Sequence, residues 1–270
     1  KVPFLLVGKV IIGKTWLDKT IYDDLIQIID ERKITIIIAN VDYATLVLAE
    51  LNSKYPNLGL ISSDAITCKI FLDKLKMQNH CDELSIKIIP LSANKFPMFL
   101  KPRMGSASKG IYRVNDEQYL NYLLKQIEES NYVKQKYIEG IEYTVDAYVS
   151  KNGKFVGAVP RIRHNVTAGE STTSIIIYDK EILNFTKEIL GKFNLRGPIT
   201  LQFIRTKKDL YFLEINPRFG GGVIASIEAG FDIPKIMIQD YLDVQLSNKY
   251  KIKPVIMTRC YREAFHAINN

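Results

Sequence analysis

Cysteine is scarce in this sequence, and long apolar runs are absent. The three cysteines among 270 residues cannot all pair with one another, and none lies at metal-ligand spacing from another. Reduced thiols in a cytoplasmic protein are the simplest interpretation. No apolar run approaches the ~20 residues of a membrane-spanning helix, and the opening KVPFLLVGKVIIGK lacks the cleavage pattern of a signal peptide. We therefore expect a cytoplasmic protein without a membrane partner.

Basic runs are also missing, although the net charge is +8 and the pI about 9.2. The lysines and arginines are scattered, and no cluster of aromatic residues is interleaved with arginine. We do not expect nucleic acid as a partner, because a polyanionic small substrate explains local positive charge equally well. An α/β domain that binds nucleic acid is the alternative, and the net charge is its only support.

Two common catalytic motifs do not occur. The sequence has no Gly-x-Ser-x-Gly elbow, and His80, His164 and His266 show no metal-ligand spacing. We therefore expect no covalent intermediate on the protein.

The pattern of apolar residues changes along the chain. Up to residue 72, helical spacing alternates with β-branched runs such as ITIIIAN (34–40), which predicts a parallel βαβ sheet. Such a domain normally opens with a strand and a glycine turn, and here this start looks curtailed; whether residues are missing before Lys1 or near Gly8 is left open. From residue 142 the pattern is antiparallel, with Asn152-Gly153 as a hairpin turn. The predicted fold class is α/β followed by α+β.

A second hairpin is predicted from ITLQFIR and LYFLEIN. If residues 207–209 form a three-residue loop, Gln202 lies opposite Glu214 and Thr200 opposite Asn216 on one face. A carboxylate that faces side-chain carbonyls forms the all-oxygen set that Mg²⁺ takes, completed by phosphate oxygens. The alternative is a buried polar cluster that joins the two strands, although a lone buried carboxylate is costly without a cation.

Arg218 follows this hairpin, two residues after Asn216. If the chain stays extended past Pro217, the guanidinium points the same way and suits a phosphate or carboxylate oxygen. The glycines at 220–222 allow backbone to approach a ligand closely. The alternative is a surface arginine in a loop.

The stretch KPRMGSASKG combines a lysine with small residues. Lys101 ends an apolar strand, and a loop containing Ser106, Ala107, Ser108 and Gly110 can fold its N–H groups around phosphate oxygens. The lysine precedes the loop and no Gly-Lys-Ser/Thr follows, so the stretch is not a Walker A motif. A flexible hairpin tip is the alternative.

The stretch KQKYIEGIEY (134–143) predicts a strand that breaks at Glu139-Gly140. Free backbone groups at the break can contact an adenine edge, and Glu142 can accept hydrogen bonds from ribose hydroxyls. Taken alone, a bulged connection with two solvated glutamates is an equal alternative.

Together, DKLKM, KPRMGSASKG, KQKYIEGIEYTVD and LQF…FLEINPRFGGG resemble the ATP-grasp superfamily in their order and spacing, and within it the carbamoyl-phosphate-synthase-like carboxylate-amine ligases. The resemblance runs from about residue 9 to 262. It implies a pre-ATP-grasp α/β domain (1–72), a small lid subdomain (73–138) and a large subdomain with the metal site (139–270).

The resemblance also implies a role for each matching residue. Lys74, Lys101 and the loop 104–110 match the triphosphate contacts, and Glu142 matches the ribose acid. The other matches are Gln135, Lys136, Tyr137 and Ile138 for adenine, Gln202, Glu214 and Asn216 for metal, Arg218 for phosphoryl transfer, and Arg161 and Arg163 for the substrate or acyl-phosphate. Many members have an acid where this chain has Gln135 or Gln202. His164, beside the arginine pair, is either a base toward the amine or a structural histidine.

The reaction implied is attack of a substrate carboxylate on the γ-phosphate of ATP, followed by displacement of phosphate by an amine. The implied cofactors are ATP and Mg²⁺, with Mn²⁺ as a substitute, and the partners are a small carboxylate and an amine. A homodimer is left open. The alternatives are a regulatory subunit that binds nucleotide without turnover, and a carboxylase-type enzyme that activates bicarbonate.

Overall fold

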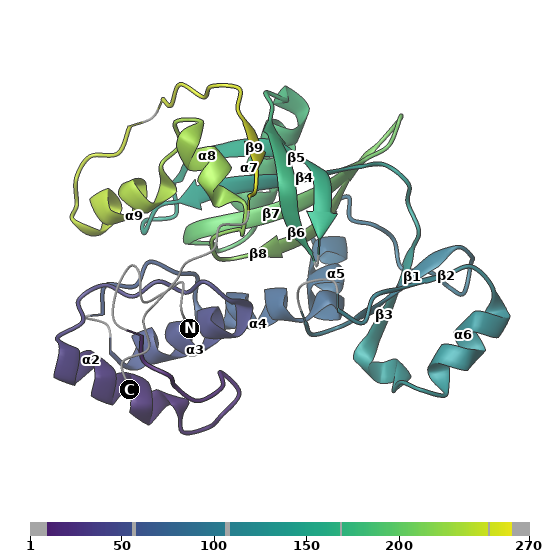
Figure 1. Ribbon diagram of the computed structural model, residues 1–270, viewed down its shortest axis with the longest axis horizontal. Helices are drawn as coiled ribbons and strands as arrows, with labels where there is room; N and C mark the ends of the chain where they lie inside the picture. The colour runs from purple at the N-terminus through teal and green to yellow at the C-terminus, as the bar shows by residue number, and fades with distance from the viewer. Residues whose placement is uncertain (1–9, 56–57, 106–108, 168, 248, 261–270) are drawn as a thin grey trace.

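The computed structural model describes residues 10–55, 58–105, 109–167, 169–247 and 249–260. Within these residues the chain forms a small and a large antiparallel sheet with helices around them (Figure 1). The elements in chain order are α2 (Ile21–Arg32), α3 (Asp42–Lys54), α4 (Ala65–Leu72), α5 (Lys74–Glu83), β1 (Met98–Pro102), β2 (Tyr112–Val114), α6 (Glu117–Leu124), the 3₁₀ turn η1 (Glu129–Asn131), β3 (Tyr132–Lys136), β4 (Ile141–Val149), β5 (Phe155–Thr167), β6 (Glu170–Ile176), α7 (Lys180–Lys192), β7 (Gly197–Arg205), β8 (Leu210–Asn216), α8 (Val223–Glu228), α9 (Ile233–Tyr241) and β9 (Ile256–Thr258).

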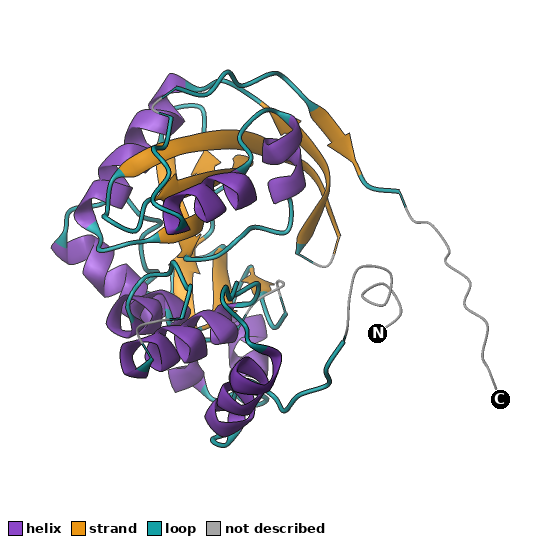
Figure 2. Ribbon diagram, turned by 90° about the vertical axis from the view of Figure 1, so that its left-hand side faces the viewer, coloured by secondary structure: helices purple, strands orange, loops and turns teal. Residues whose placement is uncertain are grey.

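The large sheet has the strand order β8-β7-β4-β5-β6-β9. Its central strand β4 is buried on both faces, as Figure 2 shows by the helices on either side of the strands. The odd-numbered side chains from Tyr143 to Val149 enter the core that contains α7, and Tyr148 enters a second core with α8 and α9. Thr144 and Asp146 alternate with the first set, so they lie on the face away from α7. This places polar side chains inside an otherwise apolar strand.

Helix α7 is placed on the large sheet by its cap and its apolar stripe. The Asp179 carboxylate accepts from the N–H of Ile182 at 3.0 Å, which satisfies one of the free N–H groups at the helix start. Ile182, Thr186 and Ile189 recur at helical spacing and are fully buried. The cap and the apolar stripe together explain why the helix covers Lys180–Lys192.

The small sheet has the order β2-β1-β3, with α6 on one face. Met98 and Leu100 are fully buried against α6, so the alternating residues Phe99 and Lys101 face the other way. The capping residue of α6 is Asp116, whose carboxylate accepts from the N–H of Tyr119 at 2.8 Å. Asn115 and Gln118 have the spacing of a capping box in the sequence, but the cap lies one residue later.

The parallel sheet expected before residue 72 is reduced to one isolated bridge. Ile36 pairs with Gly59 in parallel, and the N–H of Ile37 donates to the carbonyl of Gly59 at 3.1 Å. No further strand lies beside this pair within the described residues, and Ile34 and Ile38 are exposed. The predicted run 34–40 was wrong in extent, because a β-branched run forms a strand only where neighbours pair with it. Helices α2 and α3 were predicted correctly.

Several elements were not predicted from the sequence, among them α4, β6, α8, α9 and β9. Helix α4 begins at Asp64, which accepts from the N–H of Thr67 at 2.9 Å, and α9 begins at Asp232 with a proline in its first turn. Such starts are readable N-cap signals. Within the described residues, no helix has both the length and the apolar content to cross a membrane.

Candidate functional site

Two rows of polar side chains cross the large sheet on the face away from α7. Cα pairing joins the strands residue by residue, and residues directly opposite one another share a face. The first row is Arg161, Thr144, Gln202 and Glu214, and the second contains Asp146, Thr200 and Asn216. The predicted pairs Gln202 with Glu214 and Thr200 with Asn216 are confirmed.

The turn of this hairpin is longer than predicted. The N–H of Thr206 donates to the carbonyl of Asp209 at 2.9 Å, so the loop covers 206–209 instead of 207–209. A bulge between Gln202 and Phe203 leaves Leu213 without a partner and shifts the register by one. The two differences cancel, so the predicted partners of Glu214 and Asn216 are correct although the predicted loop was wrong.

Glu214 is the centre of the predicted metal set. Its Oε1 accepts from Nε2 of Gln202 at 2.5 Å and from Nδ2 of Asn216 at 3.3 Å. The Asn216 amide presents its oxygen to a cation after a half-turn, since O and N are interchangeable in shape, whereas the Gln202 oxygen accepts from Nη1 of Arg163 and turns to a cation only when that bond is released. Among the described residues, no group of three His, Cys, Asp or Glu side chains could hold a metal. One carboxylate and two amide oxygens therefore fit a hard divalent cation that takes its remaining ligands from phosphate.

Lys101 reaches the same place from the small sheet. Its side chain is buried with its Nζ 5.3 Å from the centre of the Phe99 ring, and it makes no hydrogen bond or ion pair with another described residue. Burial lowers the pKa of Lys101, Lys74 lowers it further, and the charges of Glu214 and Glu142 act in the opposite direction. The ammonium therefore lies within electrostatic reach of carboxylates on both edges of the candidate site.

Lys74 stands at the start of α5 beside the predicted lid loop. Its Nζ donates to the carbonyl of Gly105 at 3.0 Å, and its N–H donates to the carbonyl of Arg103 at 2.9 Å. Gly110, on the far side of the loop, has φ +70°, a conformation that favours glycine. The predicted phosphate contacts Ser106, Ala107 and Ser108 lie outside the described residues.

The predicted adenine hinge follows β3. Gln135 is buried on the face shared with Phe99, and the N–H groups of Lys136 and Tyr137 donate to Pro90 and Pro97. The N–H of Ile138 donates to no described residue. A free backbone donor at the break is the group that a base acceptor requires.

Glu142, the predicted ribose acid, is tied to the metal set by Arg163. The Nη1 of Arg163 donates to Glu142 Oε2 and to Gln202 Oε1, both at 3.0 Å, and its Nη2 donates to the carbonyl of Gly169 at 2.8 Å. The structure thus brings Arg163, Glu142 and Gln202 together.

Arg161 is less accessible than a substrate contact requires. It is 3% exposed, and its Nε donates to Asp146 at 3.0 Å. A Cβ at Gly222 would lie 2.6 Å from its guanidinium carbon, so the glycine backbone covers it. The charge of Arg161 is therefore already paired and enclosed, and its contact with the substrate stays a prediction. His164 is exposed on the same strand, and its role as a base stays a prediction.

Arg218 does not continue the alternation of β8. Its N–H bonds back to the carbonyl of Asn216 at 2.8 Å, which turns the chain at Pro217. Its Nη2 donates to Oδ2 of Asp42 at 3.1 Å, and its Nε bonds to the other carboxylate oxygen. The expectation of an extended chain was wrong, and Arg218 instead pairs with the first residue of α3.

We expect Asp42→Asn to lower the free energy of unfolding by about 1–3 kcal/mol, the range for hydrogen bonds to charged groups. Both side chains of the Asp42–Arg218 pair are only 17% exposed, so removing one charge leaves the other poorly solvated. Urea unfolding followed by far-UV circular dichroism measures the change.

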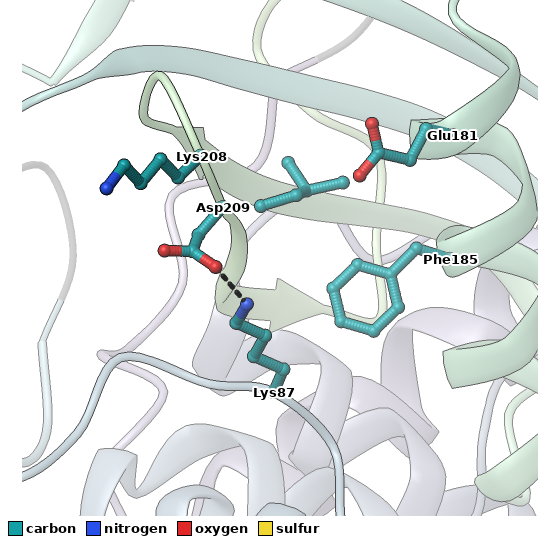
Figure 3. A pocket seen from close by; sticks show the side chains of 6 residues that line it. Lys87, Glu181, Phe185, Lys208 and Asp209 are labelled. Atoms are coloured by element: carbon teal, nitrogen blue, oxygen red, sulfur yellow. Dashed lines mark hydrogen bonds and ion pairs between the residues drawn. The ribbon is translucent and has the colours of Figure 1, made fainter.

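The Lys87–Asp209 ion pair supplies the control. The two charges lie 2.6 Å apart in a pocket of about 220 Å³ at the hairpin turn (Figure 3). Asn216 ends β8 at the strand's other end. Both side chains are largely exposed, so we expect Asp209→Asn to leave stability unchanged within error. Equal effects of the two variants would contradict a structural role for Asp42.

Two of these residues were missed by the sequence reasoning. The sequence did contain a pattern that indicates Asp146. Polar residues occupy every second position from Glu142 to Asp146 in an apolar strand, the same pattern that indicated Glu214. Asp42 had none, since it lies 176 positions from Arg218.

Known proteins resemble the chain both in sequence and in structure. Residues 128–262 match the family described as "ATP-grasp in the biosynthetic pathway with Ter operon". The carbamoyl phosphate synthase large chain of Clostridium beijerinckii is 31% identical over 136 residues, covering 46% of this chain and 13% of that protein. The D-alanine–D-alanine ligase of Petrotoga mobilis is 30% identical over 127 residues, covering 44% of this chain and 42% of that protein. The chain thus spans a minor part of these relatives.

Two solved structures share the fold over most of the chain. The N5-carboxyaminoimidazole synthetase from Staphylococcus aureus, complexed with ADP, superposes with a TM-score of 0.73 at 22% identity, covering 92% of this chain and 70% of that one. The biotin carboxylase domain of the Hydrogenobacter thermophilus 2-oxoglutarate carboxylase, in complex with MgADP and bicarbonate, gives 0.76 at 16% identity, covering 92% and 63%. These likenesses confirm the predicted mixed α/β fold class with its antiparallel sheets.

Proposed function

The chain belongs to the ATP-grasp family, and on this premise we propose that it is an ATP-dependent carboxylate-amine ligase. A carboxylate oxygen of the substrate attacks the γ-phosphorus of ATP, and ADP leaves. An amine nitrogen then attacks the carbonyl carbon of the acyl-phosphate, phosphate leaves, and an amide remains. Two features carry the proposal: a buried lysine on the small sheet, without a hydrogen bond or ion pair among the described residues, and a carboxylate flanked by two amides on the large sheet, whose charge acts on that lysine.

Gln202, Glu214 and Asn216 would hold Mg²⁺, or Mn²⁺ in its place. A divalent ion bound there supplies charge neutralisation for the triphosphate. With a single carboxylate in the set, the phosphates themselves contribute most of the negative charge. The three side chains would thereby hold the phosphates against the large sheet.

Lys101 and Lys74 would bind the triphosphate from the small-sheet side. Burial strengthens the attraction between the Lys101 ammonium and a phosphate oxygen, because less water screens it. The backbone of the loop 104–110, whose central residues are Ser106, Ala107 and Ser108, would close over the phosphates.

The hinge would bind the nucleoside. The N–H of Ile138 would donate to a ring nitrogen of adenine, and the carbonyl of the Gln135 side chain would accept from its amino group. Glu142 would accept from the ribose hydroxyls. Lys136 and Tyr137 would contribute backbone at the same break.

Arg163 would bind the anionic substrate, Arg218 would aid phosphoryl transfer, and Arg161 would act as a positioning residue beneath Gly222. Arg163 donates to both Glu142 and Gln202, which supports a place for its guanidinium between the proposed ribose and metal positions. The identity of the acid and the amine, the domain boundaries at 72 and 138, a homodimer and a cytoplasmic location stay predictions.

Nucleotide binding is the first test of the proposal. MgADP should raise the melting temperature by several degrees, because a ligand at 100 times its Kd adds about 2.7 kcal/mol. ADP release should then appear in a screen of small carboxylates, bicarbonate and amines. Release that needs both an organic carboxylate and an amine supports the ligase. Release with bicarbonate alone indicates the carboxylase type, stabilisation without release indicates a regulatory subunit, and no stabilisation contradicts the proposal.

A further inference from the structure

Three polar side chains form a continuous chain from the surface of α5 to the small sheet. Gln135 is 4% exposed, and its Nε2 donates to Oε1 of Gln78 at 3.2 Å. Gln78 is 1% exposed, and its Nε2 donates to Asp82 at 3.3 and 3.4 Å. Asp82 lies one helical turn after Gln78 and is exposed to solvent.

The chain of hydrogen bonds has a fixed direction. A carboxylate only accepts, so the NH₂ group of Gln78 must face Asp82 and its carbonyl must face Gln135. The NH₂ group of Gln135 is thereby committed to Gln78. Its carbonyl oxygen accepts from no described residue and is the atom left for a ligand. A side-chain amide without such neighbours can present either end, since the two orientations have the same shape.

We propose that Asp82 and Gln78 orient the Gln135 amide so that the protein selects adenine over guanine nucleotides. Adenine carries an amino donor at C6, and guanine carries a carbonyl acceptor there. A carbonyl oxygen held toward C6 accepts a hydrogen bond from the amino group of adenine. The same oxygen repels the carbonyl oxygen of guanine. The inference rests on the proposed function, because it assumes that the base binds beside Gln135. Asp82 and Gln78 are positioning residues, since they act through Gln135 and do not touch the base.

Asp82→Lys is the decisive variant, because it replaces an acceptor by a donor at an exposed position. The introduced ammonium would donate to the Gln78 carbonyl, the Gln78 amide would turn, and the Gln135 amide would turn with it. We expect the ratio of the GDP to the ADP dissociation constant to fall by about 5- to 150-fold, the range for one well-placed base contact. Isothermal titration with ADP and with GDP measures both constants. The proposed contact from the Ile138 N–H is the same in the variant and in the native chain. It therefore does not contribute to the difference between their GDP-to-ADP ratios.

Two further variants make the result specific. Glu83→Lys introduces the same change of charge at the neighbouring, exposed position of α5 and should leave the ratio unchanged. Gln135→Glu offers two accepting oxygens whichever way it turns, so Asp82→Lys should have no effect in that background.

Three results would overturn the inference. One is an unchanged ratio in Asp82→Lys, and another is an equal fall in Glu83→Lys. The third is a fall that persists in the Gln135→Glu background, because it would come from charge and not from amide orientation. Failure of the native chain to bind ADP at all would instead overturn the proposed function, and it is seen in the first titration.

Discussion

Replacement of Lys101 by methionine should lower the rate of ADP release by about 10²- to 10³-fold, the loss that follows removal of one preorganised electrostatic contact in a closed site. The ammonium is buried, makes no ion pair with a described residue, and lies within reach of Glu214. Such a group has no evident structural reason to be charged. It is available to a phosphate oxygen whose negative charge grows during transfer.

The same substitution should stabilise the ligand-free protein. Burial lowers the pKa of Lys101 below its ordinary value of 10.5. At a pH below the pKa of Lys101 in the folded protein, this lysine is charged in both the folded and the unfolded state. The cost of desolvating its charge then opposes folding in full. As the pH rises from this pKa toward 10.5, Lys101 loses its proton in the folded protein before it does so in the unfolded protein. The desolvation cost therefore decreases, and the native chain becomes more stable. Lys101→Met should therefore gain stability over the native chain at about pH 7, and the difference should narrow as the pH approaches the ordinary lysine pKa in urea unfolding.

Lys134→Met is a suitable control for Lys101→Met. Lys134 belongs to the same small sheet, but it faces away from the site and pairs with Glu129 at 2.5 Å. This variant should keep the rate of ADP release. A Lys101→Met protein that is folded and turns over at the native rate would remove Lys101 from the mechanism.

The strand pairing that was predicted correctly lies within a single hairpin. Glu214 and Gln202 are 12 positions apart, and the alternation of a strand decides their common face whatever the rest of the fold does. An error of one residue in the loop was harmless only because a bulge after Gln202 compensated for it. Neither the bulge nor its position is encoded in the polar pattern.

The part that could not be predicted depends on contacts between distant segments. Arg218 lies beside a polar strand, but its partner Asp42 belongs to a helix 176 positions earlier. Arg161 looked free because its partner Asp146 is set by the hairpin pairing and its cover by the loop at Gly222. A sequence motif identifies which residue types gather at a site, whereas tertiary packing decides which of their faces are open.

The second large effect is expected from Glu214→Gln, which removes the only carboxylate among the three predicted metal ligands. Three amides supply oxygens without a negative charge, and hard divalent cations bind neutral sets weakly. ADP release should fall by about 10²- to 10³-fold or more. The affinity for metal-free ADP should stay near that of the native chain, because the hinge contacts at Ile138 are unaffected. Isothermal titration with and without Mg²⁺ separates the two effects.

Gln202→Glu is the opposite change at the partner position of the same ladder. Gln202 Nε2 now donates to Glu214 at 2.5 Å. In the variant a second carboxylate would face Glu214 at this position, and the repulsion between the two should destabilise the metal-free protein. A divalent cation relieves that repulsion, and the Mg²⁺ concentration needed for half-maximal ADP release should fall. If Glu214→Gln left that concentration unchanged, or if Gln202→Glu raised it, the cation would bind elsewhere. The side chains of Gln202, Glu214 and Asn216 would then be a polar cluster that joins the two strands, and not the metal site.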